Sequence, residues 1–583
     1  MKNLLQSLSL LAVVILAVFA IGSSLDGNQE NKPFIPGKII NNIKKISEEI
    51  NSIKLTKNFE DVSIFKFKPN PGYSKQQNEV LKKASNLSIN KEALKNILSF
   101  PKENIVFKIP VSGAGYIELE LTRNKVFSGD AKFSTISPSG KSPYNYVPGI
   151  YYKGIIKGDN NSLAAISIFE NNVIGIISDR DGNYTLGKID NKPNGASEDY
   201  VYYKESDLKI KNKFVCKVND YDEKIAKTTQ KAIRNLAKVK ENNPDYVNST
   251  LPIKVYFEAD YSMYQKYNLY PRHVYDVLAA EFNFINVLYQ NEQIPIEMSE
   301  VGVWTSIDPY EFYNDSYSIL LEFGANNRDN FYANIGQLVS VGHDQILGGI
   351  AWINVLCQPY NPQDSSGRFS FANIDTLIWG YPSYTWDVEV MTHEMGHNIG
   401  SRHTHACVWP TAPGVIGAID SCYYAEGNCF SQTQPNYNGT IMSYCHLNGA
   451  INFALGFGPL PGDTIRYTYS LAGCLFSYIH SSELPNTFEL MQNFPNPFNP
   501  VTKIGYAVPK DAYITLKIYD ITGREIASLV NHRFYSAGFY NVSFSASDYS
   551  LASGVYFYKL VAFDASNPQS NLFTQVKKMI LTK

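Results

Sequence analysis

Three histidines, one glutamate and one glycine in the string HEMGHNIGSRH could assemble a metal centre. His393 and His397 are four positions apart, so on a helix both imidazoles project from one face and can bind one ion. Glu394 lies beside them, where a carboxylate can take a proton from a water that the metal activates. Gly400 can adopt a positive φ and turn the chain back, so that His403 arrives as a third ligand. Three neutral nitrogen ligands leave one zinc position open, which is typical of a catalytic site.

The full spacing HExxHxxGxxH resembles the signature of the metzincin zinc peptidases, in which a methionine-containing turn follows downstream. The string GTIMSYCH supplies such a turn, with Met442 placed 39 residues after His403. The resemblance implies that Met442 forms an apolar floor beneath the zinc. Tyr444, two residues later, stands where some metzincins carry a tyrosine that reaches the zinc or the oxyanion. A packing role for Tyr444 agrees equally well with the sequence.

Further strings resemble the reprolysin (adamalysin, ADAM-like) branch of the metzincins. GGIAWINVLC is similar to the edge strand above that family's cleft, which implies that Gly349, Ile350 and Ala351 pair with an extended peptide substrate. AGCLF is similar to the C-terminal helix and cysteine of the same domain, which implies a Cys357–Cys474 disulfide. The segment 151–189 resembles a reprolysin propeptide.

The match departs from the reprolysin pattern just after the third histidine. Reprolysins carry Asp there, whereas this chain has Thr404 and His405. For His405 and for His446, we expect positions at the surface or behind the metal ligands. Assignment to the metzincins is therefore better supported than assignment to one branch.

The cysteines separate into a cluster and one outlier. Six of the seven fall within residues 357–474 and could form three disulfides, with fifteen connectivities open. Cys216 stands far upstream. Because a thiolate is a good zinc ligand, Cys216 could take the open zinc position and keep the enzyme latent. The alternative is a buried or unpaired thiol without that role.

The N-terminus predicts export. Lys2 precedes an apolar run, Leu4–Ile21, and small residues follow at Ala20, Gly22 and Ser24, as in a secretory signal peptide. The alternative is an uncleaved membrane anchor, although Gln6, Ser7 and Ser9 shorten the apolar core. No other stretch approaches the ~20 apolar residues that a membrane span requires. Export also permits disulfides.

Composition shifts predict four segments. These are a signal peptide at 1–24, a propeptide at 25–245, a peptidase domain at 250–480 and a secretion domain at 486–583. From Lys204 to Lys240 there are eleven Lys and Arg against five Asp and Glu, which indicates either a solvated helix or linker or a processing site. We expect helices over 37–57, 271–289 and 315–326, and strands over 253–259, 294–304 and 348–357.

The last hundred residues contain no cysteine and alternate apolar and polar positions in short runs. Such runs, separated by turns, favour a small antiparallel β-sandwich. FELMQNFPNPFNPVTKIGYAVP, LKIYDITGREIASL and ASGVYFYKL resemble the type A C-terminal sorting domain of the Bacteroidetes type IX secretion system. The alternative is an accessory sandwich that binds carbohydrate or protein.

Composition narrows the function classes. The chain has 583 residues, 44% hydrophobic and 18% charged residues and a net charge of −2, which excludes a disordered or fibrous protein and gives no basis for nucleic-acid binding. We therefore expect a multidomain protein with a mixed α/β metzincin domain, a β-rich propeptide and a C-terminal antiparallel immunoglobulin-like β-sandwich. It would be a zinc endopeptidase that cleaves extracellular proteins, with Glu394 as general base. It would be exported through Sec to the periplasm and passed to the type IX machinery, and then released or kept at the cell surface. No stable membrane span would remain after signal removal.

Two questions stay open on sequence alone. The competing function is an inactive surface adhesin that keeps the metzincin fold, although such a relative would be expected to lose Glu394 or a histidine. A structural Ca²⁺ beside the catalytic zinc has no sequence signature here.

Overall fold

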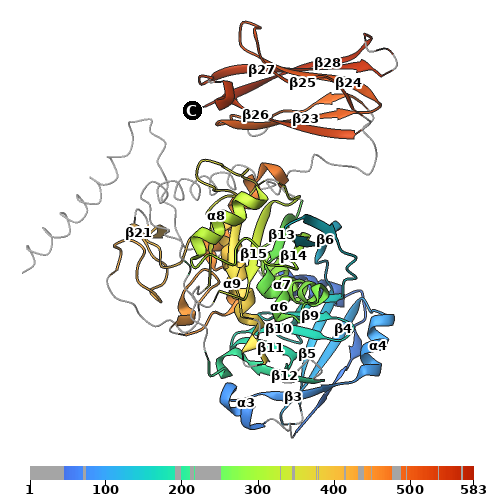
Figure 1. The fold of residues 1–583 in the computed structure, drawn as a ribbon, viewed down its shortest axis with the longest axis vertical. Helices are drawn as coiled ribbons and strands as arrows, with labels where there is room; N and C mark the ends of the chain where they lie inside the picture. The colour runs from blue at the N-terminus through green and yellow to red at the C-terminus, as the bar shows by residue number, and fades with distance from the viewer. Residues whose placement is uncertain are drawn as a thin grey trace, which may run out of the picture.

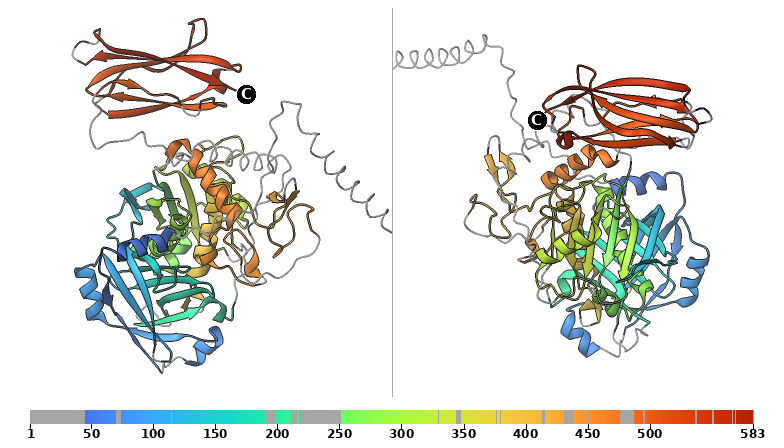
Figure 2. Two further views of the ribbon diagram at one scale, coloured as in Figure 1. Left: turned by 180° about the vertical axis from the view of Figure 1, so that it is seen from behind. Right: turned by 45° about the horizontal axis from the view of Figure 1, so that its top comes forward.

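The computed structural model comprises an N-terminal sheet, a central α/β part and a C-terminal pair of sheets (Figures 1 and 2). It describes residues 45–69, 74–113, 115–190, 198–210, 216, 251–328, 330–343, 348–375, 377–378, 380–412, 415–430, 439–447, 449–475, 487–493, 496–535, 538–549, 551–565, 567 and 569–582. The predicted signal peptide lies outside these residues, as does most of the basic stretch after Cys216.

The N-terminal part is a ten-stranded sheet in the order β1-β4-β5-β8-β9-β10-β11-β12-β3-β2. β1 and β2 follow one another directly along the chain yet lie at opposite ends of this order, so the sheet must curl. Ile105, Phe107, Leu119, Ile166 and Tyr152 fill its core. The strands are β1 (Glu60–Val62), β2 (Phe65–Phe67), β3 (Ser85–Ile89), β4 (Asn104–Val111), β5 (Gly115–Arg123), β8 (Ile150–Ile156), β9 (Leu163–Ile168), β10 (Val173–Asp179), β11 (Gly182–Lys188) and β12 (Asp199–Lys204).

The described helices of this part lie outside the sheet. They are α2 (Lys45–Lys54), α3 (Ser74–Val80) and α4 (Lys91–Ser99). Asn90 caps α4 by accepting a hydrogen bond from the Ala93 amide. The helix predicted over 37–57 is thus confirmed for Lys45–Lys54, and its first residues lie outside the described part of the chain.

The central sheet has seven strands in the order β16-β17-β15-β13-β14-β6-β7. Five come from the predicted peptidase domain: β13 (Ile253–Ala259), β14 (Ile296–Trp304), β15 (Ile335–Ser340), β16 (Gly348–Ala351) and β17 (Phe369–Asn373). The other two, β6 (Phe127–Ser137) and β7 (Gly140–Pro143), come from the predicted propeptide. β16 is antiparallel to β17 and forms one edge, while β7 forms the other.

Helices flank this sheet and position its polar residues. They are α6 (Tyr261–Lys266), α7 (Pro271–Asn291), α8 (Ser316–Asn327), α9 (Tyr384–Asn398) and α10 (Pro459–Leu471). Asp315 caps α8 by accepting a hydrogen bond from the Ser318 amide. α7 is buried over most of its length because it contacts β14 of one sheet and β8 and β9 of the other. The predicted helices and the strands at 253–259 and 294–304 are confirmed in these positions.

The strand predicted over 348–357 is shorter than expected. It ends at Ala351, and the following residues run as turns, with positive φ at Asn354 and Cys357. The amides of Asn354, Val355 and Leu356 instead donate to the carbonyls of His397 and Asn398, at distances of 2.9–3.0 Å. This loop therefore satisfies carbonyls that the end of α9 would leave without partners.

Three disulfides join the six clustered cysteines: Cys357–Cys474, Cys407–Cys429 and Cys422–Cys445. The predicted Cys357–Cys474 pair is confirmed. It ties the loop after β16 to the segment after α10.

The C-terminal part consists of two antiparallel sheets, β22-β23-β26 and β25-β24-β27-β28, which share one core. Its strands are β22 (Glu489–Leu490), β23 (Val501–Val508), β24 (Ala512–Tyr519), β25 (Glu525–Tyr535), β26 (Gly538–Ser545), β27 (Gly554–Asp564) and β28 (Asn571–Leu581). Two packed sheets agree with the predicted sandwich, and its immunoglobulin-like character stays a prediction. Among the described residues, no helix has the length and apolarity to cross a bilayer.

Candidate metal centre

The centre is built on the last two turns of α9. His393, Glu394 and His397 all lie on this helix and are buried. After Ile399, Gly400 adopts φ +103°, a left-handed conformation that glycine reaches without strain. A side chain at Gly400 would also meet Thr468 Oγ1 at 2.5 Å. The chain can therefore reverse here and bring His403 back toward the helix.

The three imidazoles converge on one point. The Nε2 atoms are 3.2 Å apart for His393 and His397, 3.1 Å for His397 and His403, and 3.2 Å for His403 and His393. Ligands about 2.0–2.1 Å from a tetrahedral zinc ion are separated by about 3.3 Å. The spacing of the three nitrogens thus fits a single zinc ion.

The outer nitrogens face acceptors, which sets the tautomer of each ring. Nδ1 lies 2.8 Å from the Ile441 carbonyl for His393, 3.0 Å from the Ser401 carbonyl for His397 and 2.7 Å from Glu426 Oε1 for His403. A proton on each Nδ1 leaves each Nε2 lone pair free to bind metal. Burial, together with the neighbouring imidazoles, holds the pKa of His393 and of His397 well below its usual value, so both are neutral.

Cys216 lies against this cluster. Its sulfur is 3.6 Å from Glu394 Oε2 and 3.8 Å from His397 Nε2, and its side chain is buried. One ligand atom from Cys216 and one from each of the three histidines lie within 4.8 Å of one another. The structure thus brings together residues that are far apart in the sequence.

Met442 packs against α9 at Gly396. It is fully buried, and a Cβ added at Gly396 would meet its sulfur at 2.7 Å. The Thr404 amide and hydroxyl both donate to the Met442 carbonyl, at 3.1 and 3.3 Å. Thr404, where the reprolysin pattern has Asp, therefore fastens the turn of the third histidine to the methionine turn.

Tyr444 lies beside the histidines and reaches Cys216. Its ring centroid is 4.9 Å from that of His403, and its hydroxyl donates to the Cys216 carbonyl at 2.7 Å. In this state, the Tyr444 hydroxyl holds the segment that carries the thiol.

The predicted edge strand also borders the centre. Gly349, Ile350 and Ala351 lie in β16 at the sheet edge. A Cβ added at Gly349 would meet the Phe371 carbonyl oxygen at 2.5 Å and Glu394 Oε1 at 2.7 Å, so glycine leaves room both for the neighbouring strand and for that carboxylate. A peptide bound along β16 would thus pass beside Glu394.

Glu426 is a residue that the sequence analysis missed. Its Oε1 accepts from both His403 Nδ1 and His405 Nε2, at 2.7 and 3.1 Å. Although burial opposes it, the two imidazoles hold the pKa of Glu426 well below its usual value. His405 is buried and stacks on His403, with ring centroids 4.9 Å apart, so it lies behind the ligand. Glu426 belongs to an irregular loop between two cysteines, where no periodicity or motif marks it.

His446 is held away from the ligand set. Its Nδ1 lies 2.8 Å from Glu389 Oε1, and both side chains are nearly buried. Two other clusters of His, Cys and acidic residues occur among the described residues, and each contains a single carboxylate: His403, His405 and Glu426; and Asp420 with Cys422 and Cys445, whose sulfurs are already joined in a disulfide. Neither is the oxygen-rich set that Ca²⁺ prefers.

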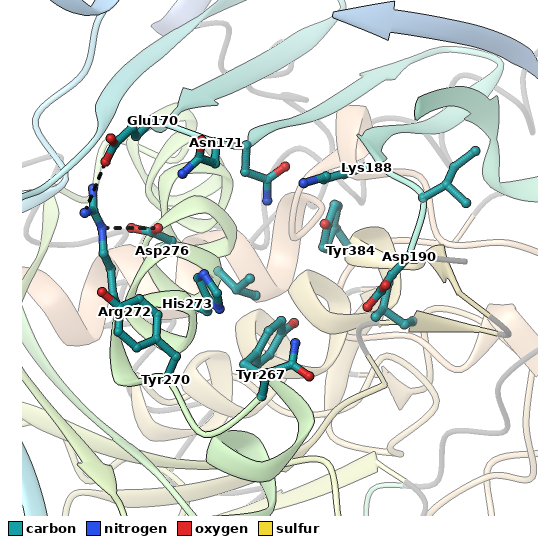
Figure 3. A pocket seen from close by; sticks show the side chains of 15 residues that line it. Glu170, Asn171, Lys188, Asp190, Tyr267, Tyr270, Arg272, His273, Asp276 and Tyr384 are labelled. Atoms are coloured by element: carbon teal, nitrogen blue, oxygen red, sulfur yellow. Dashed lines mark ion pairs between the residues drawn. The ribbon is translucent and has the colours of Figure 1, made fainter. Parts of the chain in front are cut away.

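A separate cavity of about 350 Å³ lies between the N-terminal sheet and the start of α7. Figure 3 shows Lys188, at the end of β11, and Asp190, two residues later, lining this cavity together with Tyr267, His273 and Tyr384. None of the three histidines of the metal centre lines it. It therefore belongs to the boundary between the two parts and not to the metal centre.

Comparisons with known proteins agree with this centre. Residues 249–453 match the metallo-peptidase family M12, in a reprolysin model, and residues 492–578 match a secretion system C-terminal sorting domain. A curated relative, the zinc metalloproteinase-disintegrin-like atragin of Naja atra, is 25% identical over 327 residues. This alignment covers 52% of the chain and 48% of the relative, so the chain spans about half the length of that protein.

Among solved structures, wild-type OgpA from Akkermansia muciniphila is 13% identical over 58% of the chain and 96% of its own length, with a TM-score of 0.19. Dimeric latent PorU from Porphyromonas gingivalis is 21% identical over 16% of the chain and 9% of its own length, with a TM-score of 0.14. At these TM-scores, neither likeness bears on fold or function. The family matches confirm the predicted resemblance: residues 249–453 resemble a reprolysin-type M12 metallopeptidase domain, and residues 492–578 resemble a sorting tail of the kind carried by secreted or cell-surface proteins.

Proposed function

We propose that this chain, with its M12 metallopeptidase domain and sorting tail, is a secreted zinc endopeptidase made as a zymogen. The observation that carries the proposal is the triangle of Nε2 atoms, 3.1–3.2 Å on a side, next to the buried Glu394. The domain limits proposed are 1–24 for the signal peptide, 25–245 for the propeptide, 250–480 for the peptidase and 486–583 for the sorting domain.

His393, His397 and His403 would hold the zinc. When bound there, zinc supplies Lewis acidity for the scissile carbonyl and for the attacking water. Glu394 would accept the proton of that water and pass it to the departing amine. The burial of Glu394 beside neutral histidines supports this role, because few mobile waters can compete for its carboxylate.

Substrate would be an extended segment of an extracellular protein. Strand β16 offers a sheet edge for β-augmentation, and its residues Gly349–Ala351 run beside Glu394. The scissile bond would thereby be presented to the proton acceptor. Tyr444 would then turn from Cys216 to the oxyanion, a role supported by its place against the ring of His403.

Latency would come from Cys216. Its sulfur lies 3.8 Å from His397 Nε2 and 3.6 Å from Glu394 Oε2, which supports the proposal that the thiol would exclude the attacking water. Cleavage between Lys224 and Leu251, downstream of Cys216, would let this segment leave. Removal of the sorting domain would accompany passage through the type IX machinery.

A turnover assay on the processed protein tests the proposal. Casein or gelatin should be cleaved, cleavage should stop when a zinc chelator is added, and it should return with added zinc. Chelator-insensitive cleavage would refute the zinc mechanism. The absence of cleavage from a protein that contains zinc and lacks the Cys216 segment would favour the inactive adhesin.

A further inference from the structure

The predicted propeptide completes the central sheet. Here the prodomain means the described residues between 45 and 216. Its strand β6 runs parallel to β14, with pairs from Met298↔Phe127 to Trp304↔Ile136, and β7 adds the outer edge. Without the prodomain, the backbone N–H and C=O groups along one side of β14 would have no strand partner. The sheet is therefore shared between prodomain and peptidase.

Charged side chains reinforce this pairing. Lys141 binds Glu300 at 2.9 Å, Lys125 binds Glu297 at 2.5 Å, and Lys254 binds Asp130 at 2.9 Å. Each pair joins the prodomain to the peptidase. Because these pairs are partly exposed, they fix the register more than they stabilise the contact.

The helix α7 is buried by both parts. Asn124 of the prodomain donates to Asn283 and Asn286 on α7, at 2.8 and 2.9 Å, and all three side chains are buried. Asn283 in turn donates to Ser167 Oγ at 3.0 Å. Separation of the two parts would break all three of these hydrogen bonds.

Apolar and aromatic contacts extend the same boundary. One continuous core cluster contains Val126, Tyr151 and Ile174 of the prodomain together with Phe282 and Leu278 of α7. Tyr275 of α7 donates to the Ser134 carbonyl at 2.9 Å, and Tyr146 donates to Asp276 at 2.8 Å. A peptidase freed of the prodomain would expose a face of α7 that is now part of its core.

The latency element is attached to this boundary by a short tether. Ile210 is the last residue packed against the cluster that joins Val201 and Tyr203 to Ile378 and Tyr381. Cys216 is six positions after Ile210 in the sequence, and six Cα–Cα steps of extended chain reach about 20 Å. Once the chain is cut downstream, Cys216 can leave the histidines and Tyr444 while the rest of the prodomain keeps its contacts with the peptidase.

We propose that the cleaved prodomain stays on the peptidase as a non-covalent subunit, and that activation removes only the Cys216 segment from the metal centre. This inference rests on the proposed zymogen. The mature enzyme is then a complex of two chains whose central sheet includes β6 and β7.

A nicking experiment tests the retention of the prodomain. A recognition sequence for a site-specific protease is placed between Lys224 and Leu251 in the full chain carrying Glu394→Gln, which prevents self-digestion. After complete cutting, both fragments should elute together in size-exclusion chromatography and separate only in denaturant. Elution of the two fragments in separate peaks would overturn the proposal.

Matched variants of the nicked protein show which contacts hold the fragments. Asn124→Ala should raise the dissociation constant at least about tenfold, because two buried hydrogen bonds are lost. Asn161→Ala, an exposed asparagine of the prodomain, should leave it unchanged. Thermal melting of the uncut variants shows that each is folded. Equal dissociation constants for the two variants in folded protein would overturn the assigned surface.

The same cut in the chain with Glu394 intact separates this proposal from the proposed function. Turnover by the co-eluting pair supports both. Co-elution without turnover would support retention of the prodomain and would refute either the peptidase assignment or the release of Cys216 from the metal centre. Turnover only after the fragments separate would overturn retention and leave the peptidase assignment in place.

Discussion

Glu426 is expected to strengthen zinc binding by holding His403. In Glu426→Gln, the side chain loses its charge, and its single amide oxygen replaces the carboxylate that accepts from His403 and His405 at 2.7 and 3.1 Å. A hydrogen bond to a charged group contributes roughly 1 kcal/mol more than a neutral one, and of the two bonds only the one to His403 reaches a zinc ligand. The expected loss of zinc affinity is therefore about fivefold, near the lower end of the effects seen for residues that support a metal ligand.

The assay is competition for zinc with a chromophoric chelator, carried out in a Cys216→Ala background so that the thiol does not contribute. Glu311→Gln, an exposed change of the same charge, serves as the matched control and should bind zinc like the parent. An unchanged zinc affinity in folded Glu426→Gln would refute the view that this carboxylate positions His403.

Three further substitutions should each change peptide turnover or stability in a stated direction. Cys216→Ala in the uncut proprotein should give peptide turnover before any cleavage of the chain. Thiol-reactive mercurials should have the same effect on the unmodified proprotein. If the variant stays inactive until proteolysis, the thiol is not the inhibitor. Gly349→Ala should lower turnover about 10²-fold in folded protein that retains zinc, because the new Cβ meets both the Phe371 carbonyl of β17 and the Glu394 side chain. Gly129→Ala, whose Cβ meets nothing within 4 Å, should leave turnover unchanged, and equal rates for the two variants would contradict the close approach. Burial raises the pKa of Asp387 well above its usual value, so the folded protein keeps a proton that the unfolded chain releases near pH 4, and stability should fall as the pH rises from about 4 toward neutrality. Melting temperatures of Asp387→Asn should decline less over this range, and a parallel decline would refute the assignment.

Local patterns predicted the catalytic helix well. The spacing of His393 and His397 follows from helix geometry, and the turn after Gly400 follows from the conformational freedom of glycine. Asp315 marks the start of α8 because an aspartate satisfies the first free amides of a helix. In each case, a few neighbouring residues determine the outcome.

Features that depend on distant segments were not predictable in the same way. The β6 segment alternates like an ordinary strand, and nothing in it identifies β14, 160 or more residues later in the chain, as its partner. The segment after Ala351 is apolar enough to read as a strand, yet its amides bind the end of α9. The sequence around Glu426 contains no motif that predicts its role, because that role depends only on the two histidines that donate hydrogen bonds to it in the fold.

The central claim is that Glu394 performs proton transfer at a site whose ligands are three histidines. The most direct measurement compares the processed enzyme with Glu394→Gln for zinc content and for peptide turnover on the same samples. The account predicts equal zinc content and a fall in turnover of about 10²–10⁴-fold, because ligation does not need the carboxylate and proton transfer does. Turnover by a zinc-loaded Glu394→Gln enzyme at the rate of the unmodified enzyme would contradict it.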